Sequence, residues 1–107
     1  MKKIIILALI SLTASANAAN LCSRYENSER YMKAIKFLAD YQEYTVEEFC
    51  NLPRVWDLEI QPTRIINRQG EIIPHVRIQQ HMEYDSCLFM INETDYSLTS
   101  SKCYYGT

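Results

Sequence analysis

The pattern of apolar and polar positions changes from a helical period to an alternating one about halfway along the chain. In residues 28–41 apolar side chains recur every three or four positions, with charged residues between them. This spacing predicts an amphipathic helix with one face for a core. Ser23 and Glu26 have the spacing of a capping box, so the helix begins there or slightly later, at Asn27 or Ser28. The predicted core-facing positions are Tyr31, Ala34, Ile35, Leu38 and Tyr41.

A second, shorter helix is predicted at residues 46–51. Thr45 and Glu48 form another capping-box pattern, and Tyr44 and Phe49 stand at the two positions of a hydrophobic staple. Pro53 should end this helix, because the residue before a proline is disfavoured in helical conformation. The break between the two helices should fall at residues 43–44.

After Pro53 the apolar residues alternate with polar ones, as expected for half-buried β-strands. Residues 75–84 show this most clearly, with apolar residues on one side and charged or polar residues on the other. Residues 55–61 alternate in the same way, and we expect Trp56, Leu58 and Ile60 to face the core. Two further strands are predicted at about residues 86–91 and 96–105, with a turn at residues 92–95 between them.

The register of the first hairpin follows from its two apolar faces. A two-residue turn would place one of the two apolar sets in solvent, because a one-residue slip turns every side chain over. A three-residue loop at residues 68–70 keeps both sets together and puts Gly70 where a bulged hairpin needs a positive φ. In this register Asp57 faces His81, and Glu59 faces Gln79.

The order of these elements predicts an α+β fold. One long and one short N-terminal helix should pack on a four-stranded, mostly antiparallel sheet, in a single small domain of residues 19–107.

Residues 1–18 are predicted to be a secretory signal peptide. Lys2 and Lys3 precede a short apolar run, and small residues ending in Ala16 and Ala18 resemble a cleavage site. The short basic start is typical of bacterial export signals, so we expect the mature protein in the periplasm or the medium, without a membrane span.

All four cysteines lie after the predicted cleavage site, at Cys22, Cys50, Cys87 and Cys103. An even number of cysteines in a small exported domain predicts two disulfides. Of the three connectivities, we favour Cys22–Cys50 with Cys87–Cys103, because the second pair can face each other across a hairpin. No C-x-x-C pair occurs, and we expect neither a metal nor another cofactor.

The charge of the mature chain argues against a nucleic-acid partner. Without Lys2 and Lys3, nine basic residues remain against 13 acidic ones, a net charge of −4. A mildly acidic chain without a basic run lacks the electrostatic footprint of a nucleic-acid-binding protein.

The polar face of the first two strands is the candidate functional surface. It should combine carboxylate, imidazole and guanidinium groups, which suits it to binding another protein. Eight tyrosines, including Tyr104 and Tyr105, are a second candidate feature, since tyrosine is enriched at recognition surfaces. The predicted binding residues on the outer face of the sheet are Asp57, Glu59, His75, Arg77, His81 and Glu83.

The most favoured function is an exported protein-binding module without enzymatic activity, such as an inhibitor, an immunity factor or an accessory to envelope assembly. The alternative is a small secreted hydrolase of the ribonuclease type that uses His75, His81, Glu59 and Arg77, because such groups on a sheet face can perform general acid–base catalysis. A third possibility is a structural subunit, for which a long unpaired strand edge is expected.

Overall fold

The computed structural model describes residues 20–105, so the predicted signal peptide lies outside the described residues. The predicted fold class is confirmed: two helices and a four-stranded antiparallel sheet with two disulfides. In chain order the elements are the 3₁₀ turn η1 (Ser23–Tyr25), α2 (Glu29–Tyr41), α3 (Val46–Phe49), β1 (Val55–Ile66), β2 (Ile72–Met82), β3 (Asp85–Asn92) and β4 (Ser97–Tyr105).

Both helices begin at residues that were predicted to be N-terminal caps. Helix α2 starts at the latest of the predicted positions, where the Ser28 hydroxyl accepts a hydrogen bond from the backbone N–H of Tyr31. Helix α3 has the full capping box: Thr45 Oγ1 accepts from Glu48 N at 3.0 Å, and Glu48 Oε1 accepts from Thr45 N at 2.8 Å. The break between the helices lies at Glu43, whose φ is 67°.

The four strands form a meander in the order β1-β2-β3-β4, with all neighbours antiparallel. The predicted register of the first hairpin is confirmed, with Asp57 opposite His81 and Glu59 opposite Gln79. Gly70 has a φ of +81° in the three-residue loop, and its N–H donates to the carbonyl of Asn67. Strand β2 begins at Ile72, earlier than the alternation of residues 75–84 indicated.

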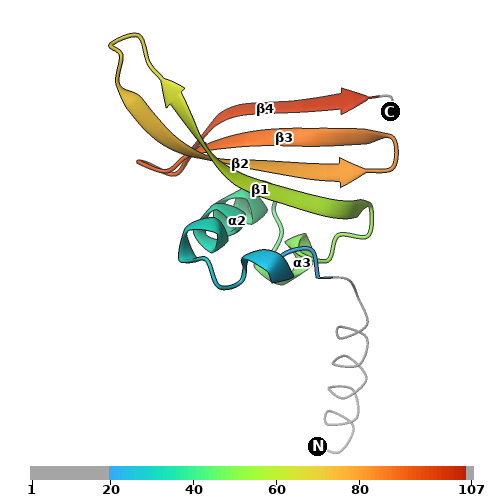
Figure 1. Ribbon diagram of the computed structural model, residues 1–107. Coiled ribbons are helices and arrows are strands. Elements are labelled where there is room, and N and C mark those ends of the chain that lie inside the picture. The colour runs from blue at the N-terminus through green and yellow to red at the C-terminus, as the bar shows by residue number, and fades with distance from the viewer. Residues whose placement is uncertain (1–19, 106–107) are drawn as a thin grey trace, which may run out of the picture.

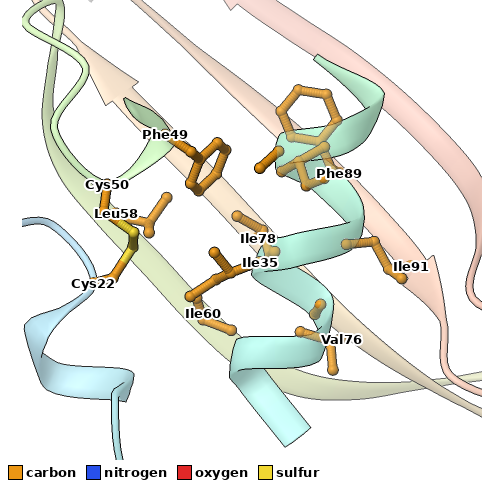
Figure 2. Packing of buried hydrophobic residues seen from close by; sticks show 13 residues of the cluster. Cys22, Ile35, Phe49, Cys50, Leu58, Ile60, Val76, Ile78, Phe89 and Ile91 are labelled. Carbon is orange, nitrogen blue, oxygen red and sulfur yellow. A yellow bond between two sulfur atoms is a disulfide. The ribbon is translucent and has the colours of Figure 1, made fainter. Parts of the chain in front are cut away.

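The core lies between the helices and one face of the sheet. Figure 1 shows α2 and α3 on the same side of the sheet, with the far end of the β1–β2 hairpin extending beyond them. In Figure 2, Ile35 of α2 packs over Ile60 and Ile78, and Phe49 of α3 packs beside Leu58. Tyr41, predicted to face the core, is exposed instead because it occupies the last position of α2.

The predicted disulfide pairing is confirmed. The Cα atoms of Cys22 and Cys50 are 5.3 Å apart, and those of Cys87 and Cys103 are 4.0 Å apart. The first bridge is buried beside Leu58 (Figure 2) and holds η1 against the end of α3. The chain closes this loop because the segments on both sides of the helices fold back: the backbone N–H of Leu21 donates to the carbonyl of Cys50 at 2.8 Å.

Segment η1 protects the outer edge of β1. The hydroxyl of Tyr25 donates to the Leu58 carbonyl at 3.0 Å and accepts from the Ile60 N–H at 3.1 Å. The Ile60 N–H would otherwise remain unpaired at the sheet edge, whereas the Leu58 carbonyl also accepts a hydrogen bond from Arg24. The first disulfide therefore holds in place the segment that covers the edge of β1.

An ion pair joins the start of α2 to the turn between β3 and β4. Arg30 Nε and Nη2 donate to the two carboxylate oxygens of Glu93 at 2.6 and 2.5 Å. The hydrogen bond to Glu93 raises the pKa of the Arg30 guanidinium above its ordinary value. This contact fixes the β3–β4 turn to the helical layer.

Within residues 20–105, neither helix has the length and apolar character needed to cross a membrane.

Candidate functional site

A β-bulge at the start of β1 turns Trp56 out of the core. Val55 lies opposite Met82 and Asp57 lies opposite His81, so Trp56 is an extra residue in the ladder. Val55 is consequently buried, whereas Trp56 is 66% exposed. The prediction that Trp56 shares the core face with Leu58 and Ile60 is therefore wrong. The sequence was ambiguous here, because Val55 and Trp56 are both apolar and either can begin the buried face.

The exposed Trp56 ring packs against His81 of the neighbouring strand. The two ring centroids are 5.5 Å apart, with 35° between the ring planes. His81 in turn contacts the carboxylate of Glu59 through Nε2. Trp56, His81 and Glu59 therefore form a chain of contacts across the surface of the sheet. This arrangement resembles the pre-ordered aromatic anchors of protein interfaces.

Arg24 of η1 reaches over the same region of the sheet. Its Nη2 atom is 3.2 Å from Asp57 Oδ1 and donates to the Leu58 carbonyl at 2.6 Å. Asp57 is thus paired with a cation from another element. No sequence pattern indicated this contact, because the first disulfide and the fold of η1 bring Arg24 there.

Of the residues that the structure describes, Asp57, Glu59 and His81 form a group that could hold a metal ion. Among residues 20–105, they offer ligand atoms that all lie within 4.8 Å of one another. In the described structure these groups have other partners: Arg24 pairs with Asp57, and His81 pairs with Glu59. Each carboxylate of this cluster therefore has a direct partner within the protein.

A pocket of about 870 Å³ lies at the end of the sheet where β1 begins, β2 turns into β3, and β4 ends. Three strongly exposed rings line it: Trp56, Tyr84 at 72% and Tyr105 at 80% exposure. We call this pocket the strand-end pocket. Its lining residues are Pro53, Arg54, Trp56, Met82, Glu83, Tyr84, Asp85 and Tyr105.

The predicted binding residues divide into two groups. Asp57, Glu59 and His81 lie together beside Trp56, and Glu83 lines the strand-end pocket with it. Trp56 thus connects the predicted charged face to the pocket.

The other two predicted binding residues lie farther along β2 and have their own partners. His75 is 1% exposed, so the expectation that it is displayed in solvent is wrong. Its Nδ1 lies 3.0 Å from the Ile73 carbonyl and its Nε2 lies 2.8 Å from the Thr99 hydroxyl. Arg77 is partly buried and donates from Nη2 to Gln79 Oε1 at 3.2 Å.

A second bulge lies at Thr99, whose hydroxyl contacts the His75 ring. Met90 lies opposite Ser100 and Ile91 lies opposite Leu98, so Thr99 has no residue opposite it in the ladder. The Thr99 hydroxyl is thereby available to the His75 ring. Bulge positions of this kind have no marker in the sequence, so the burial of His75 could not be predicted.

Several residues of the strand-end pocket were missed by the sequence pattern. The tyrosine content did indicate an aromatic recognition surface near the C-terminus, and Tyr105 belongs to the pocket. Nothing in the sequence shows that this end of β4 lies near Trp56 and the β2–β3 turn.

Comparisons of the chain with protein-family models, with curated proteins and with solved structures found no match.

Proposed function

We propose that this chain is an exported protein-binding module whose partner docks on the surface around Trp56. Two disulfides are typical of an oxidising compartment, the periplasm or the extracellular space. The observation that carries the proposal is the exposure of Trp56, which a bulge turns outward and His81 supports. Exposed, positioned tryptophan, tyrosine and arginine side chains supply most of the binding energy in protein interfaces.

The proposed partner surface combines Trp56 with the charged groups beside it. Arg24, Asp57, Glu59 and His81 would form its polar part, and the strand-end pocket would receive a projecting side chain of the partner. An inhibitor, an immunity factor or an envelope-assembly accessory would each need such a surface. These roles differ in the partner and share the same site.

The hydrolase alternative has less support. It requires His75 to act beside His81, but the His75 ring is buried and both of its nitrogens have hydrogen-bond partners. His81 and Glu59 could act as an acid–base pair, but in the structure they contact each other, and the nearby Asp57 is paired with Arg24. We therefore propose that the protein has no nuclease activity, and an RNA cleavage assay with the purified protein tests this directly.

The binding proposal is tested with Trp56→Ala and a matched aromatic control. Tyr41→Ala removes another exposed ring, on α2. Cross-linking in an envelope extract followed by mass spectrometry identifies the partner, and the dissociation constant is then measured with purified proteins. We expect Trp56→Ala to weaken binding by roughly 2 kcal/mol, about thirtyfold, as is usual for a central aromatic contact. Equal affinities of the wild type and Trp56→Ala would remove Trp56 from the interface.

A further inference from the structure

Two carboxylates in the strand-end pocket lack partners within the described chain. Among residues 20–105, neither Glu83 nor Asp85 forms an ion pair or accepts a side-chain hydrogen bond, whereas neighbouring Asp57 and Glu59 are both paired. Both residues line the pocket, on either side of Tyr84. The pocket thus contains two acidic groups whose charge the rest of the described structure does not offset by a direct contact.

The same pocket contains the three exposed rings of Trp56, Tyr84 and Tyr105. The face of an aromatic ring carries partial negative charge and attracts an ammonium or guanidinium group, most strongly in the case of tryptophan. Aromatic faces beside carboxylates therefore complement a group that has both an apolar stem and a positive end. Lysine and arginine side chains have this composition.

We infer that the strand-end pocket binds a lysine or arginine side chain of the partner protein. In this arrangement the stem lies along the rings of Trp56, Tyr84 and Tyr105, and the cation contacts the carboxylates of Glu83 and Asp85. The inference rests on the proposed protein-binding function and adds the chemistry of the partner residue.

Arg54 provides an internal check, because it lines the same pocket and carries the same charge as the proposed ligand. It is exposed and forms no ion pair with Glu83 or Asp85 in the described structure. A cationic ligand would be repelled by Arg54, so Arg54→Ala should strengthen its binding. For an anionic ligand, Arg54→Ala should instead weaken binding.

The test uses the fluorescence of Trp56, the only tryptophan in the protein. The purified, oxidised protein is titrated separately with tetra-arginine amide, tetraglutamate and cellotetraose. The last compound is included because sugars also stack on exposed aromatic rings. We expect a saturable change with tetra-arginine amide alone, and about a two- to threefold gain in affinity with Arg54→Ala.

Charge-matched variants separate the pocket from the general negative charge of the protein. Glu83→Gln with Asp85→Asn should weaken tetra-arginine binding at least tenfold. Glu26→Gln with Glu43→Gln removes the same charge from exposed positions outside the pocket and should change it less than twofold. Tyr84→Ala, which changes no charge, should weaken binding about fivefold. Because Asp85 lies in β3, Glu83→Gln alone, in the exposed turn, is measured as a second variant with an expected loss of about threefold.

Three results would overturn the inference: no saturable response to tetra-arginine amide, equal losses in the two double variants, or saturation by cellotetraose instead. Measurements with the partner separate this inference from the proposed function. If the partner loses affinity for Trp56→Ala but binds Glu83→Gln/Asp85→Asn normally, the protein-binding proposal stands and the basic side chain is excluded. If the partner binds Trp56→Ala with unchanged affinity, the proposed binding surface is wrong. The peptide titration then still shows whether the pocket binds a basic side chain.

Discussion

Trp56 occupies a position in which its side chain contributes little to the stability of the fold. Burial of a large apolar side chain typically stabilises a domain by roughly 1.5–3 kcal/mol, and Trp56 is instead 66% exposed. The bulge places the smaller Val55 in the core and turns the larger ring toward His81. Bulges frequently redirect a side chain at a functional site. The outward orientation of Trp56 is the reason for placing the binding surface around it.

Gly70 is the residue for which backbone conformation alone determines the effect of a substitution. Its φ is +81°, and a Cβ added there would meet no atom within 4 Å. We therefore expect Gly70→Ala to destabilise the domain by about 1 kcal/mol through backbone strain, without a steric clash. Gly70→Val should cost more, since a β-branched residue is rarer still at positive φ. Chemical denaturation measures both, and an unchanged midpoint in both variants would contradict the three-residue turn.

The two histidines should respond differently to the same substitution. His75→Ala leaves a cavity and removes the partner of the Thr99 hydroxyl, so we expect a loss of roughly 2–4 kcal/mol in unfolding free energy. His81→Ala, at a partly exposed position, should cost about 1 kcal/mol or less. Urea denaturation of the two variants measures the difference. A loss of about 1 kcal/mol or less for His75→Ala as well would show that the burial of His75 contributes little to stability.

At the scale of elements, the local signals predicted most of the fold. The Thr45–Glu48 capping box formed as expected, and the register of the first hairpin followed from two apolar faces and Gly70. These features depend on residues close in sequence or on a period that the whole strand shares. The positions of the bulges could not be predicted, because each lies within the first three residues of its strand. Too few residues precede it for the change in the phase of the alternation to be visible.

The contact between η1 and β1 is another feature of this scale that could not be predicted from the sequence. Tyr25→Phe removes only the hydroxyl that bonds to the Leu58 carbonyl and the Ile60 N–H. We expect this variant to lose about 1 kcal/mol of stability, because the Ile60 N–H loses its partner while the Leu58 carbonyl keeps its hydrogen bond from Arg24. Tyr31→Phe is the matched control: its ring packs on Tyr25 at 5.9 Å between centroids, and its hydroxyl has no hydrogen bond within the described residues. Thermal unfolding compares the two, and equal melting temperatures would contradict the role of the Tyr25 hydroxyl.

At the scale of the whole molecule, the candidate site is assembled from segments far apart in the sequence. Arg54 and Trp56 come from the start of β1, Glu83 and Tyr84 from the β2–β3 turn, and Tyr105 from the end of β4. The alternating pattern of β1 and β2 predicted a charged outer face, and Asp57, Glu59 and His81 form it. The aromatic part required the meander order, which places the beginning of β1, the β2–β3 turn and the end of β4 at one end of the sheet (Figure 1).

The two edges of the sheet determine whether copies of this protein can pair with each other, as a structural subunit would. Residues of η1 cover the edge of β1 at Leu58 and Ile60, whereas β4 forms the opposite edge and is mostly exposed along its length. Two features of β4 oppose pairing with a second copy: the bulge at Thr99 and the charged side chain of Lys102. We therefore expect the purified protein to be monomeric.

Lys102→Leu tests this expectation, because it removes the one charged side chain of β4 without altering the core. An apolar residue here extends an uncharged edge that already contains Tyr104 and Tyr105, and the strand then has less to prevent it from pairing with another copy. We expect concentration-dependent association of this variant in light scattering coupled to size exclusion, whereas Lys36→Leu, on the exposed side of α2, should remain monomeric like the wild type. Association of the wild type through β4 would instead support the structural-subunit function. A monomeric Lys102→Leu variant would show that the bulge, or the short length of strand beyond it, is sufficient to protect the edge.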